Sequence, residues 1–281
     1  MSSTKQPSKL IKSTIGHDEK LKLAILRDLI STEESLRWMN LDDKFLLKYL
    51  RAREGDVHQA LEHISGYFKL RRNEPQLFQL PGAVFDTFTS GIFRFLPHKS
   101  RRGELMVLMR AKAWNPDQFD MYHVMSGLIP FYEIMTDDDE SIQKNGVIEV
   151  LDMRGLTMSS CLRISLGHHR VFVQLMDTGL PIRYNRLHVC YASKVVDIAW
   201  HVMRHFMSAS LRDRIVFHGN DMSTLHDDVG VEKLPIDLGG TWRMVDDESD
   251  TRNQWSVNDI RELNVRVANY WKKYPADKDI N

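Results

Sequence analysis

The chain has 281 residues, of which 42% are hydrophobic, and its 38 Lys and Arg residues balance 38 Asp and Glu residues. This length can bury a substantial core in one large domain or two small ones. The zero net charge argues against a general nucleic-acid-binding protein, which needs a clustered excess of basic residues. Two cysteines cannot form a disulfide framework, so we expect a reducing, cytoplasmic setting.

The N-terminal segment is polar and rich in Ser, Thr and Lys, and we expect residues 1–17 to form a disordered arm. It lacks the apolar centre of a secretory signal. Nowhere do apolar residues approach the roughly 18 consecutive positions that span a bilayer.

Residues 18–76 are predicted to form a small all-helical module. Apolar residues first recur with helical spacing from Leu21 to Leu29. Asp42 is placed to cap a second helix, and Gly55 is placed to end it. Asp56 opens a third helix, which Pro75 closes.

Residues 85–245 are predicted to form an α/β/α domain with a mainly parallel sheet, because strand-like and helical segments alternate along them. The expected strands are 92–95, 104–110, 146–152, 187–191 and 214–218. The expected helices between them are 114–136, 158–177 and 194–208. A last helix at 257–270 belongs to a C-terminal extension, residues 246–281.

The common catalytic and phosphate-binding motifs GxxxxGK[ST], GxGxxG and GxSxG are absent from the sequence, so we expect a binding protein and not an enzyme. His201 and His205 share one helical face but lack the Glu of an HExxH zinc site. The adjacent His168 and His169 would point in different directions on a helix. Asp and Glu residues at 137–140 lack the spacing of a calcium loop and favour a solvated connector. We therefore expect no metal and no cofactor.

The segment 194–208 is strongly amphipathic, with an apolar stripe covering about half of the helix circumference. This pattern is typical of an ordinary covering helix, but also of a lid over a lipid or of a helix that touches a bilayer. Six Lys and Arg residues against two Asp residues give residues 183–214 a local charge of +4. Nine acidic residues against two basic ones give residues 221–250 a charge of −7, so the overall neutrality is a cancellation.

Several segments, taken in order, resemble the CRAL-TRIO lipid-transfer family, and in particular its α-tocopherol transfer protein, retinaldehyde-binding protein and clavesin group. The resemblance covers about residues 20–245. It rests on 45–53 (FLLKYLRAR), 145–152 (NGVIEVLD), the basic loop and amphipathic helix at 183–208, 218–220 (HGN), 234–235 (LP) and 239–240 (GG).

The resemblance implies a CRAL-TRIO N-terminal module on an α/β lipid-binding domain, in which one hydrophobic ligand lies behind a mobile lid helix, here 195–206. On the lid, the implied ligand contacts are Val195, Ile198, Val202, Met203 and Phe206. Elsewhere in the domain they are Met125, Leu128, Tyr132, Val147, Leu151, Ile164, Val171, Leu175, Leu187 and Val189. For each of these residues, plain core packing is the alternative.

Several relatives also bind phosphoinositide head groups at a basic cleft beside the lid. The positions that match this cleft are Arg53, Arg183 and Arg214. Asn185 replaces a second basic residue of the loop, with Arg186 next to it, and Arg212 lies near a further replaced lysine. Arginine suits this role because its planar guanidinium group binds phosphate through two hydrogen bonds.

The leading hypothesis is therefore a monomeric cytoplasmic carrier that moves tocopherol, a retinoid, a carotenoid or a similar isoprenoid between membranes. It would attach transiently to an anionic membrane surface, assisted by phosphoinositide. One alternative is a phosphatidylinositol or phosphatidylcholine transfer protein. Another is a phosphoinositide-sensing adaptor that carries no lipid.

Overall fold

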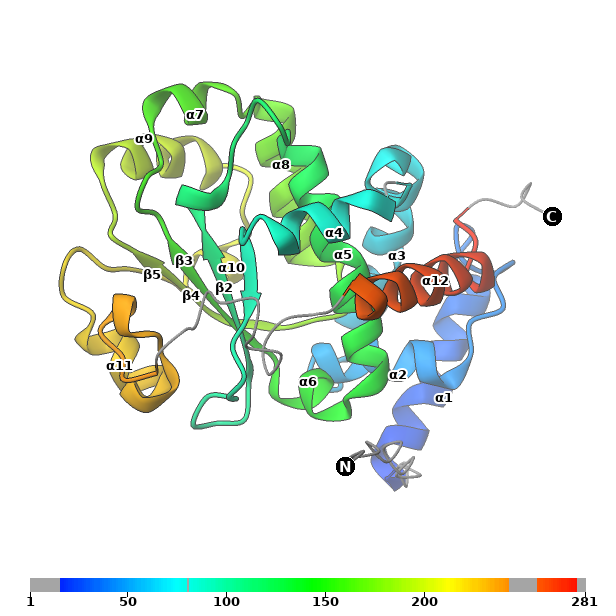
Figure 1. Ribbon diagram of the computed structural model, residues 1–281. Helices are drawn as coiled ribbons and strands as arrows, with labels where there is room; N and C mark the ends of the chain where they lie inside the picture. The colour runs from blue at the N-terminus through cyan, green and yellow to red at the C-terminus, as the bar shows by residue number, and fades with distance from the viewer. Residues whose placement is uncertain (1–15, 80, 243–256, 277–281) are drawn as a thin grey trace, which may run out of the picture.

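A computed structural model describes residues 16–79, 81–242 and 257–276, and it contains a helical part beside an α/β part (Figure 1). The first helices are α1 (His17–Thr32), α2 (Asp43–Ala52) and α3 (Val57–Asn73). The Asp42 side chain accepts a hydrogen bond from the N–H of Phe45, and Asp56 caps α3 in the same way. Carboxylates are favoured there because the first N–H groups of a helix lack partners within it. Helix α1 starts one residue before the expected boundary, and residues 1–15 of the expected arm lie outside the described residues.

In the described part of the chain, the strands form one five-stranded sheet in the order β1-β2-β3-β4-β5. The strands are β1 (Phe93–Phe95), β2 (Leu105–Arg110), β3 (Val147–Asp152), β4 (Tyr184–Cys190) and β5 (Ile215–Phe217). Strand β1 pairs antiparallel with β2, and the remaining neighbours pair parallel. The predicted α/β class with a mainly parallel sheet is confirmed.

The crossover helices cover one face of this sheet, as expected when parallel strands follow one another in order and each connection is right-handed. They are α5 (Met121–Asp138) and α6 (Glu140–Asn145), α7 (Met158–Leu162) and α8 (Leu166–Gln174), and α9 (Lys194–Met203) and α10 (Ala209–Arg212). Helix α11 (Ser223–Val229) lies on the opposite side of the sheet (Figure 1). There it packs against strand residues such as Val150 and Cys190.

Three predicted helices have different bounds in the structure. Helix α5 starts at Met121 and not near 114, and Asp120 caps it through the N–H of His123. The segment 158–177 is divided because Ser165 caps a new helix, α8, which continues into a π-helical turn at Leu175–Gly179. Helix α9 ends at Met203, and Ser208 caps the short α10 that follows.

The acidic run at 137–140 is not a solvated connector, because it links parts of the molecule that are distant in sequence. The Asp137 carboxylate lies 2.9 Å from the Nζ of Lys48, which is fully buried. The Asp138 carboxylate pairs with Arg266 at 2.5 Å. The run therefore joins the N-terminal helices to the C-terminal helix.

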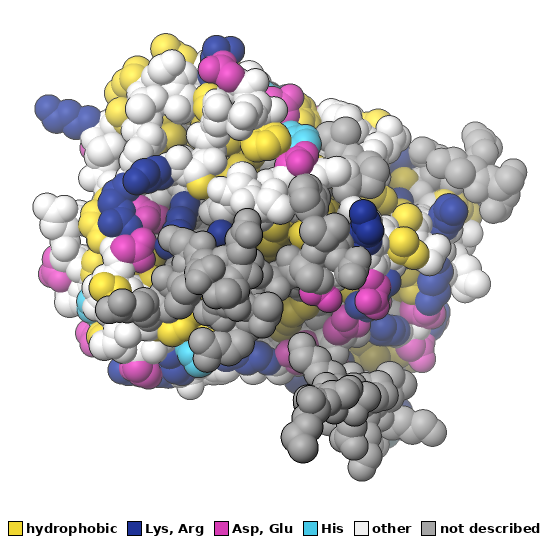
Figure 2. Space-filling model, viewed as in Figure 1, with side chains coloured by type: hydrophobic (Ala, Val, Ile, Leu, Met, Phe, Trp, Pro, Cys, Tyr) yellow, Lys and Arg dark blue, Asp and Glu magenta, His cyan; other side chains and the backbone are white. Residues whose placement is uncertain are grey.

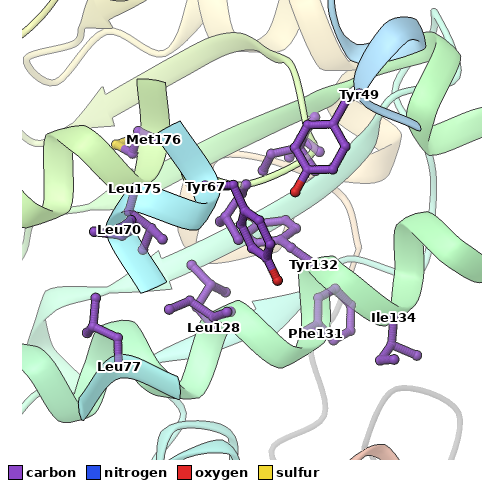
Figure 3. Packing of buried hydrophobic residues seen from close by; sticks show 14 of the residues in the cluster. Tyr49, Tyr67, Leu70, Leu77, Leu128, Phe131, Tyr132, Ile134, Leu175 and Met176 are labelled. Atoms are coloured by element: carbon purple, nitrogen blue, oxygen red, sulfur yellow. The ribbon is translucent and has the colours of Figure 1, made fainter. Parts of the chain in front are cut away.

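Helix α12 (Val257–Lys273) packs against α5 and α4 (Pro81–Thr89), beside the N-terminal helices (Figure 1). Its Tyr270 and the following Tyr274 stack around Phe45 of α2, with ring centroids 6.3 and 4.5 Å from that ring. In Figure 3, Tyr67 of α3 points toward α5, where its hydroxyl donates to Glu133 at 2.5 Å. The helical part and the α/β domain therefore share one continuous core.

Candidate functional site

An apolar cavity lies between the sheet and the helices α5, α8 and α9, with a volume of about 1240 Å³ including the space at its open mouth. Leu151 and Leu187 form its floor on the central strands, and Met125 and Leu128 of α5 form one side. These positions face inward because side chains on a strand alternate between the two faces of the sheet. Phe217 of β5 lines the cavity and is also 39% exposed, so the cavity reaches the surface beside it.

The structure brings seven of the ten expected wall residues outside the lid to this cavity, within the part of the chain that it describes. They are Met125, Leu128, Leu151, Ile164, Leu175, Leu187 and Val189. Tyr132, Val147 and Val171 lie instead in the surrounding core. The Tyr132 hydroxyl donates to the buried Glu149 at 2.8 Å, so this pair of polar side chains lies where the cavity wall gives way to solid core.

Sequence reasoning missed several wall residues, although some carried a signal. Phe172 of α8 lines the cavity in place of the expected Val171, so the predicted inner face of this helix was wrong by one residue. Trp114 enters the wall from the turn after β2, where its indole N–H donates to the carbonyl oxygen of Phe119 at 2.8 Å. Sequence periodicity does not show in which direction the side chains of a turn point, so no sequence pattern identified Trp114.

Helix α9, the expected lid, presents a different face to the cavity from the one expected. Of the five expected contacts only Met203 lines it, while Val195, Ile198, Val202 and Phe206 do not. The face that does contains Val196, Ala199, Trp200, Met203 and, beyond the helix end, Met207. The apolar stripe was so broad that its centre was misplaced by about one residue, or roughly 100° of rotation.

Two arginines come together beside the lid, one from each part of the fold. Arg53 donates from Nε to the Nδ1 of His63 at 3.1 Å and from Nη2 to the carbonyl oxygen of Asp177. Arg214 donates to the carbonyl oxygen of Tyr184 at 2.9 Å. Burial and the nearby charge of Arg214 lower the pKa of Arg53. The two cations repel each other, and an anion between them would relieve that repulsion.

The remaining expected phosphoinositide ligands have other partners. Arg183 pairs with Glu54 and donates from Nη2 to the carbonyl oxygen of Lys144 at 2.8 Å. Arg212 donates to the carbonyl oxygen of Met207 at 3.2 Å.

Arg186 lies 3.9 Å from the carboxylate of Asp228 in α11, on the opposite side of the sheet from the lid. The structure therefore does not place Arg186 with Arg53 and Arg214. Alternation along strand β4 explains this, because Arg186 and Leu187 must face opposite sides of the sheet.

A chain of hydrogen bonds connects the arginine pair to the end of the lid. The carboxylate of Asp177 accepts hydrogen bonds from the N–H and the hydroxyl of Ser208, at 3.1 and 2.8 Å. The backbone carbonyl of the same residue accepts one from Arg53. Asp177 therefore contacts both the N-terminal module and the segment that follows α9.

Exposed apolar side chains lie on α9 and on the two helices that contact it. Met158 and Leu162 of α7, Leu166 of α8 and Ile198 of α9 are 41%, 79%, 64% and 51% exposed. Helices α7 and α8 both contact α9. Figure 2 shows hydrophobic side chains on the surface at the top of the view, over α7 and α9. We call these four residues the outer apolar patch. No described helix is both long and apolar enough to span a membrane.

Residues 89–240 match the CRAL/TRIO domain family, and residues 12–66 match the CRAL/TRIO N-terminal domain. The chain belongs to the CRAL/TRIO family. This match confirms the family predicted from sequence. Members of this family bind and transfer lipids. All of the cavity residues lie within the CRAL/TRIO domain, whereas Arg53 comes from the N-terminal domain.

Two named relatives show how far the likeness extends. The human alpha-tocopherol transfer protein-like protein is 28% identical over 218 residues, which are 77% of this chain and 64% of that protein. This CRAL/TRIO chain thus spans just under two thirds of that relative's length. Human Clavesin-2 is 26% identical over 251 residues, which are 83% of this chain and 75% of Clavesin-2.

Among solved structures, that of Sfh5 has the same fold, with a TM-score of 0.55 and 12% sequence identity. The similarity covers 92% of this CRAL/TRIO chain and 99% of the Sfh5 chain. At this identity the likeness concerns the fold alone.

Proposed function

We propose that this CRAL/TRIO protein carries one hydrophobic small molecule, such as tocopherol, a retinoid, a carotenoid or a similar isoprenoid, between membranes inside the cell. The observation that carries this proposal is the apolar cavity under a lid helix. A carrier must offer a lipid an interior as apolar as the bilayer it leaves, since each buried CH₂ group contributes about 0.8 kcal/mol.

The composition of the cavity wall favours such a lipid over a phospholipid. No Lys or Arg lines the cavity among the described residues. A phospholipid head group enclosed there would bring a charged phosphate into an apolar space without a cation, which is strongly unfavourable. A molecule that is nearly all hydrocarbon has no such penalty.

The surroundings of the lid support transient docking to an anionic membrane, assisted by phosphoinositide. The outer apolar patch can enter the bilayer interface, while Arg53 and Arg214 can bind the phosphates of a head group. Each basic residue near an anionic leaflet contributes about 1 kcal/mol. A membrane that favours the open lid then shifts the population toward release of the ligand.

The proposal is tested by extracting the purified protein with organic solvent and identifying bound lipids by mass spectrometry. A stoichiometric isoprenoid supports it. A stoichiometric phospholipid favours the phospholipid-transfer alternative, and an empty cavity favours a phosphoinositide sensor.

Docking is tested separately by following transfer of retinol between vesicles with and without phosphatidylinositol bisphosphate. We expect the double variant Arg53→Gln, Arg214→Gln to bind retinol normally but to lose the acceleration that phosphoinositide gives. Arg37→Gln, at an exposed arginine of the N-terminal module, is the matched control and should keep it. If phosphoinositide accelerates transfer by the double variant as much as by the unmodified protein, these arginines do not take part in docking.

A further inference from the structure

Tyr191 adopts a left-handed backbone conformation shortly before α9 begins. Its φ is +56°, and among the described residues that are not glycine only Glu54 also has a positive φ. This conformation is unfavourable for a residue with a Cβ atom, because the Cβ lies too close to the following carbonyl oxygen, and it is rare for bulky residues. A strained backbone of this kind persists only where surrounding contacts hold it, and it is concentrated at sites that bind or switch.

The side chain of Tyr191 makes the contacts that hold this conformation. The guanidinium carbon of Arg154 lies 4.3 Å from the centre of the Tyr191 ring, a distance at which a cation is attracted to the aromatic face. The phenol hydroxyl donates to the backbone carbonyl oxygen of Asp237 at 3.0 Å. Arg154 is fixed in turn by two hydrogen bonds to the Asp152 carboxylate, at 2.9 and 2.6 Å. The ring is therefore clamped between the segment after β3 and the turn Ile236–Leu238, and these contacts offset the backbone strain.

This strained residue lies where the orientation of α9 is set. Residues 191–193 connect β4 to α9, so a rotation about the N–Cα bond of Tyr191 turns α9 relative to the sheet. Hinges are typically such positions at the ends of elements, where a few residues absorb a large change of φ and ψ. The rotation would also break the hydrogen bond from the N–H of Ala192 to the carbonyl oxygen of His218, which is 3.0 Å long. The contacts that would be lost favour the present position of α9, and the relief of strain favours leaving it.

We propose that Tyr191 is the hinge on which α9 opens the cavity. With α9 over the cavity, the backbone of Tyr191 is left-handed and its ring is held by Arg154. When α9 opens, φ becomes negative, the ring leaves Arg154, and at the far end of the moving segment Ser208 leaves Asp177. This inference rests on the proposed function, because it assigns the pivot of the same lid.

The test compares substitutions that remove the clamp equally but differ in their backbone preference. Tyr191→Gly and Tyr191→Ala both delete the ring, and only glycine adopts a positive φ without cost. If opening relieves this φ, Tyr191→Ala should release retinol about fivefold faster than Tyr191→Gly in stopped-flow measurements. Tyr191→Asn should also release retinol more slowly than Tyr191→Ala, because asparagine tolerates the left-handed conformation.

Glu54 provides the matched control, because its φ of +54° lies in the turn between α2 and α3. Glu54→Ala should be less stable than Glu54→Gly in urea titrations, just as Tyr191→Ala should be less stable than Tyr191→Gly. The two Glu54 variants should nevertheless release retinol at the same rate as each other, since this turn is not part of the connection to α9.

Equal release rates for Tyr191→Ala and Tyr191→Gly would mean that Tyr191 keeps its conformation when retinol leaves, and would overturn the hinge while leaving the carrier in place. Tyr191→Phe gives a second measurement should Tyr191→Ala fail to fold, because it keeps the ring and loses only the hydrogen bond to Asp237. It should release retinol about twofold to fivefold faster than the unmodified protein, and an unchanged rate would overturn the hinge. Failure of the unmodified protein to bind retinol would overturn the proposed function, and the hinge with it.

Discussion

The two ends of this CRAL/TRIO protein use their hydrophobic residues differently. At one end, α2, α3, α5 and α12 enclose a dense aromatic cluster with charged groups at its centre, including the fully buried Lys48 and Glu133. At the other end, α7, α8 and α9 surround a cavity and leave large apolar side chains such as Leu162 and Ile198 exposed. The first end is densely packed, and we call it the closed end. The second end, the lid end, contains the cavity and leaves apolar side chains exposed.

This contrast explains how one chain can be stable and still release a ligand. Native interiors are packed as densely as organic crystals, and regions with fewer buried contacts open at lower free-energy cost. Because the cavity lies under α9, we expect opening to be confined to that end of the molecule. We therefore expect substitutions at the closed end to change mainly the stability of the protein, and substitutions at the lid end to change mainly ligand binding.

The largest loss of stability should follow from Glu133→Ala at the closed end. The Glu133 carboxylate accepts hydrogen bonds from Tyr67 and from the indole of Trp271, each at 2.5 Å, and faces the charges of Arg71 and Lys48. Its removal leaves the Tyr67 hydroxyl and the Trp271 indole without their acceptor and takes away a negative charge that faces Arg71 and Lys48. We expect the free energy of unfolding to fall by about 3 to 5 kcal/mol in urea titrations.

Glu34→Ala is the matched control, because the Glu34 side chain is 91% exposed, and it should change stability by less than about 0.5 kcal/mol. If Glu133→Ala unfolds no more easily than Glu34→Ala, the charged cluster does not hold the closed end together.

At the lid end, two substitutions on the same helix should separate ligand binding from membrane binding. Met203→Asp places a carboxylate in the apolar cavity and should weaken retinol binding about a hundredfold. Ile198→Asp lies on the outer apolar patch and should leave retinol affinity unchanged while reducing sedimentation with anionic vesicles. The reverse pattern would mean that α9 presents its other face to the ligand.

Much of the fold could be predicted from the sequence, because caps and periodicity act locally. Asp42 and Asp56 marked helix starts, and the alternation of strands and helices indicated a parallel sheet. The divided helix at 158–177 was missed because a serine such as Ser165 is common inside helices as well as at their starts. The role of the acidic run was missed because its partners, such as Arg266, are far away in sequence.

The site was less predictable, because it depends on how elements face one another. Of the wall residues expected on strands, Leu151, Leu187 and Val189 line the cavity, because alternation has only two phases, whereas Val147 lies in the core. In the predicted helix 194–208, nine apolar residues allowed several phases, and Ile198 was assigned to the wrong side. The family resemblance pointed to Arg53 and Arg214, which lie 161 positions apart and share no local sequence pattern.

Where the two ends meet, Glu149 should make stability depend on pH. Burial raises the pKa of Glu149 from 4.5 to about 7, although the hydrogen bond from Tyr132 opposes the shift. Between these pH values the folded protein keeps a proton that the unfolded chain has released, so the free energy of unfolding falls as pH rises. Glu149→Gln should remove this fall and stabilise the protein at pH 8 by about 2 kcal/mol, measured by urea unfolding.

The control for that experiment is His188, on the other face of the sheet. Burial and the neighbouring His218 lower the pKa of His188 from 6.5 to about 4. The unfolded chain therefore holds the extra proton between these pH values, and the free energy of unfolding rises with pH. The two slopes oppose each other, so Glu149→Gln should steepen the rise and His188→Gln should flatten it. Parallel curves for both variants would contradict these assignments.

The smallest expected effect concerns the contact between Asp177 and Ser208, which joins the closed end to the lid. Asp177→Ala removes both hydrogen bonds that hold the segment after α9, but it keeps the backbone carbonyl that accepts from Arg53. Retinol should therefore dissociate several times faster in stopped-flow measurements, with little change in stability. Asp197→Ala, at an exposed position of α9, should dissociate at the unmodified rate. If Asp177→Ala releases retinol no faster than Asp197→Ala, this contact does not restrain the lid. If release is faster and phosphoinositide still accelerates transfer, the arginine pair acts on the lid by a route other than the Asp177 carboxylate.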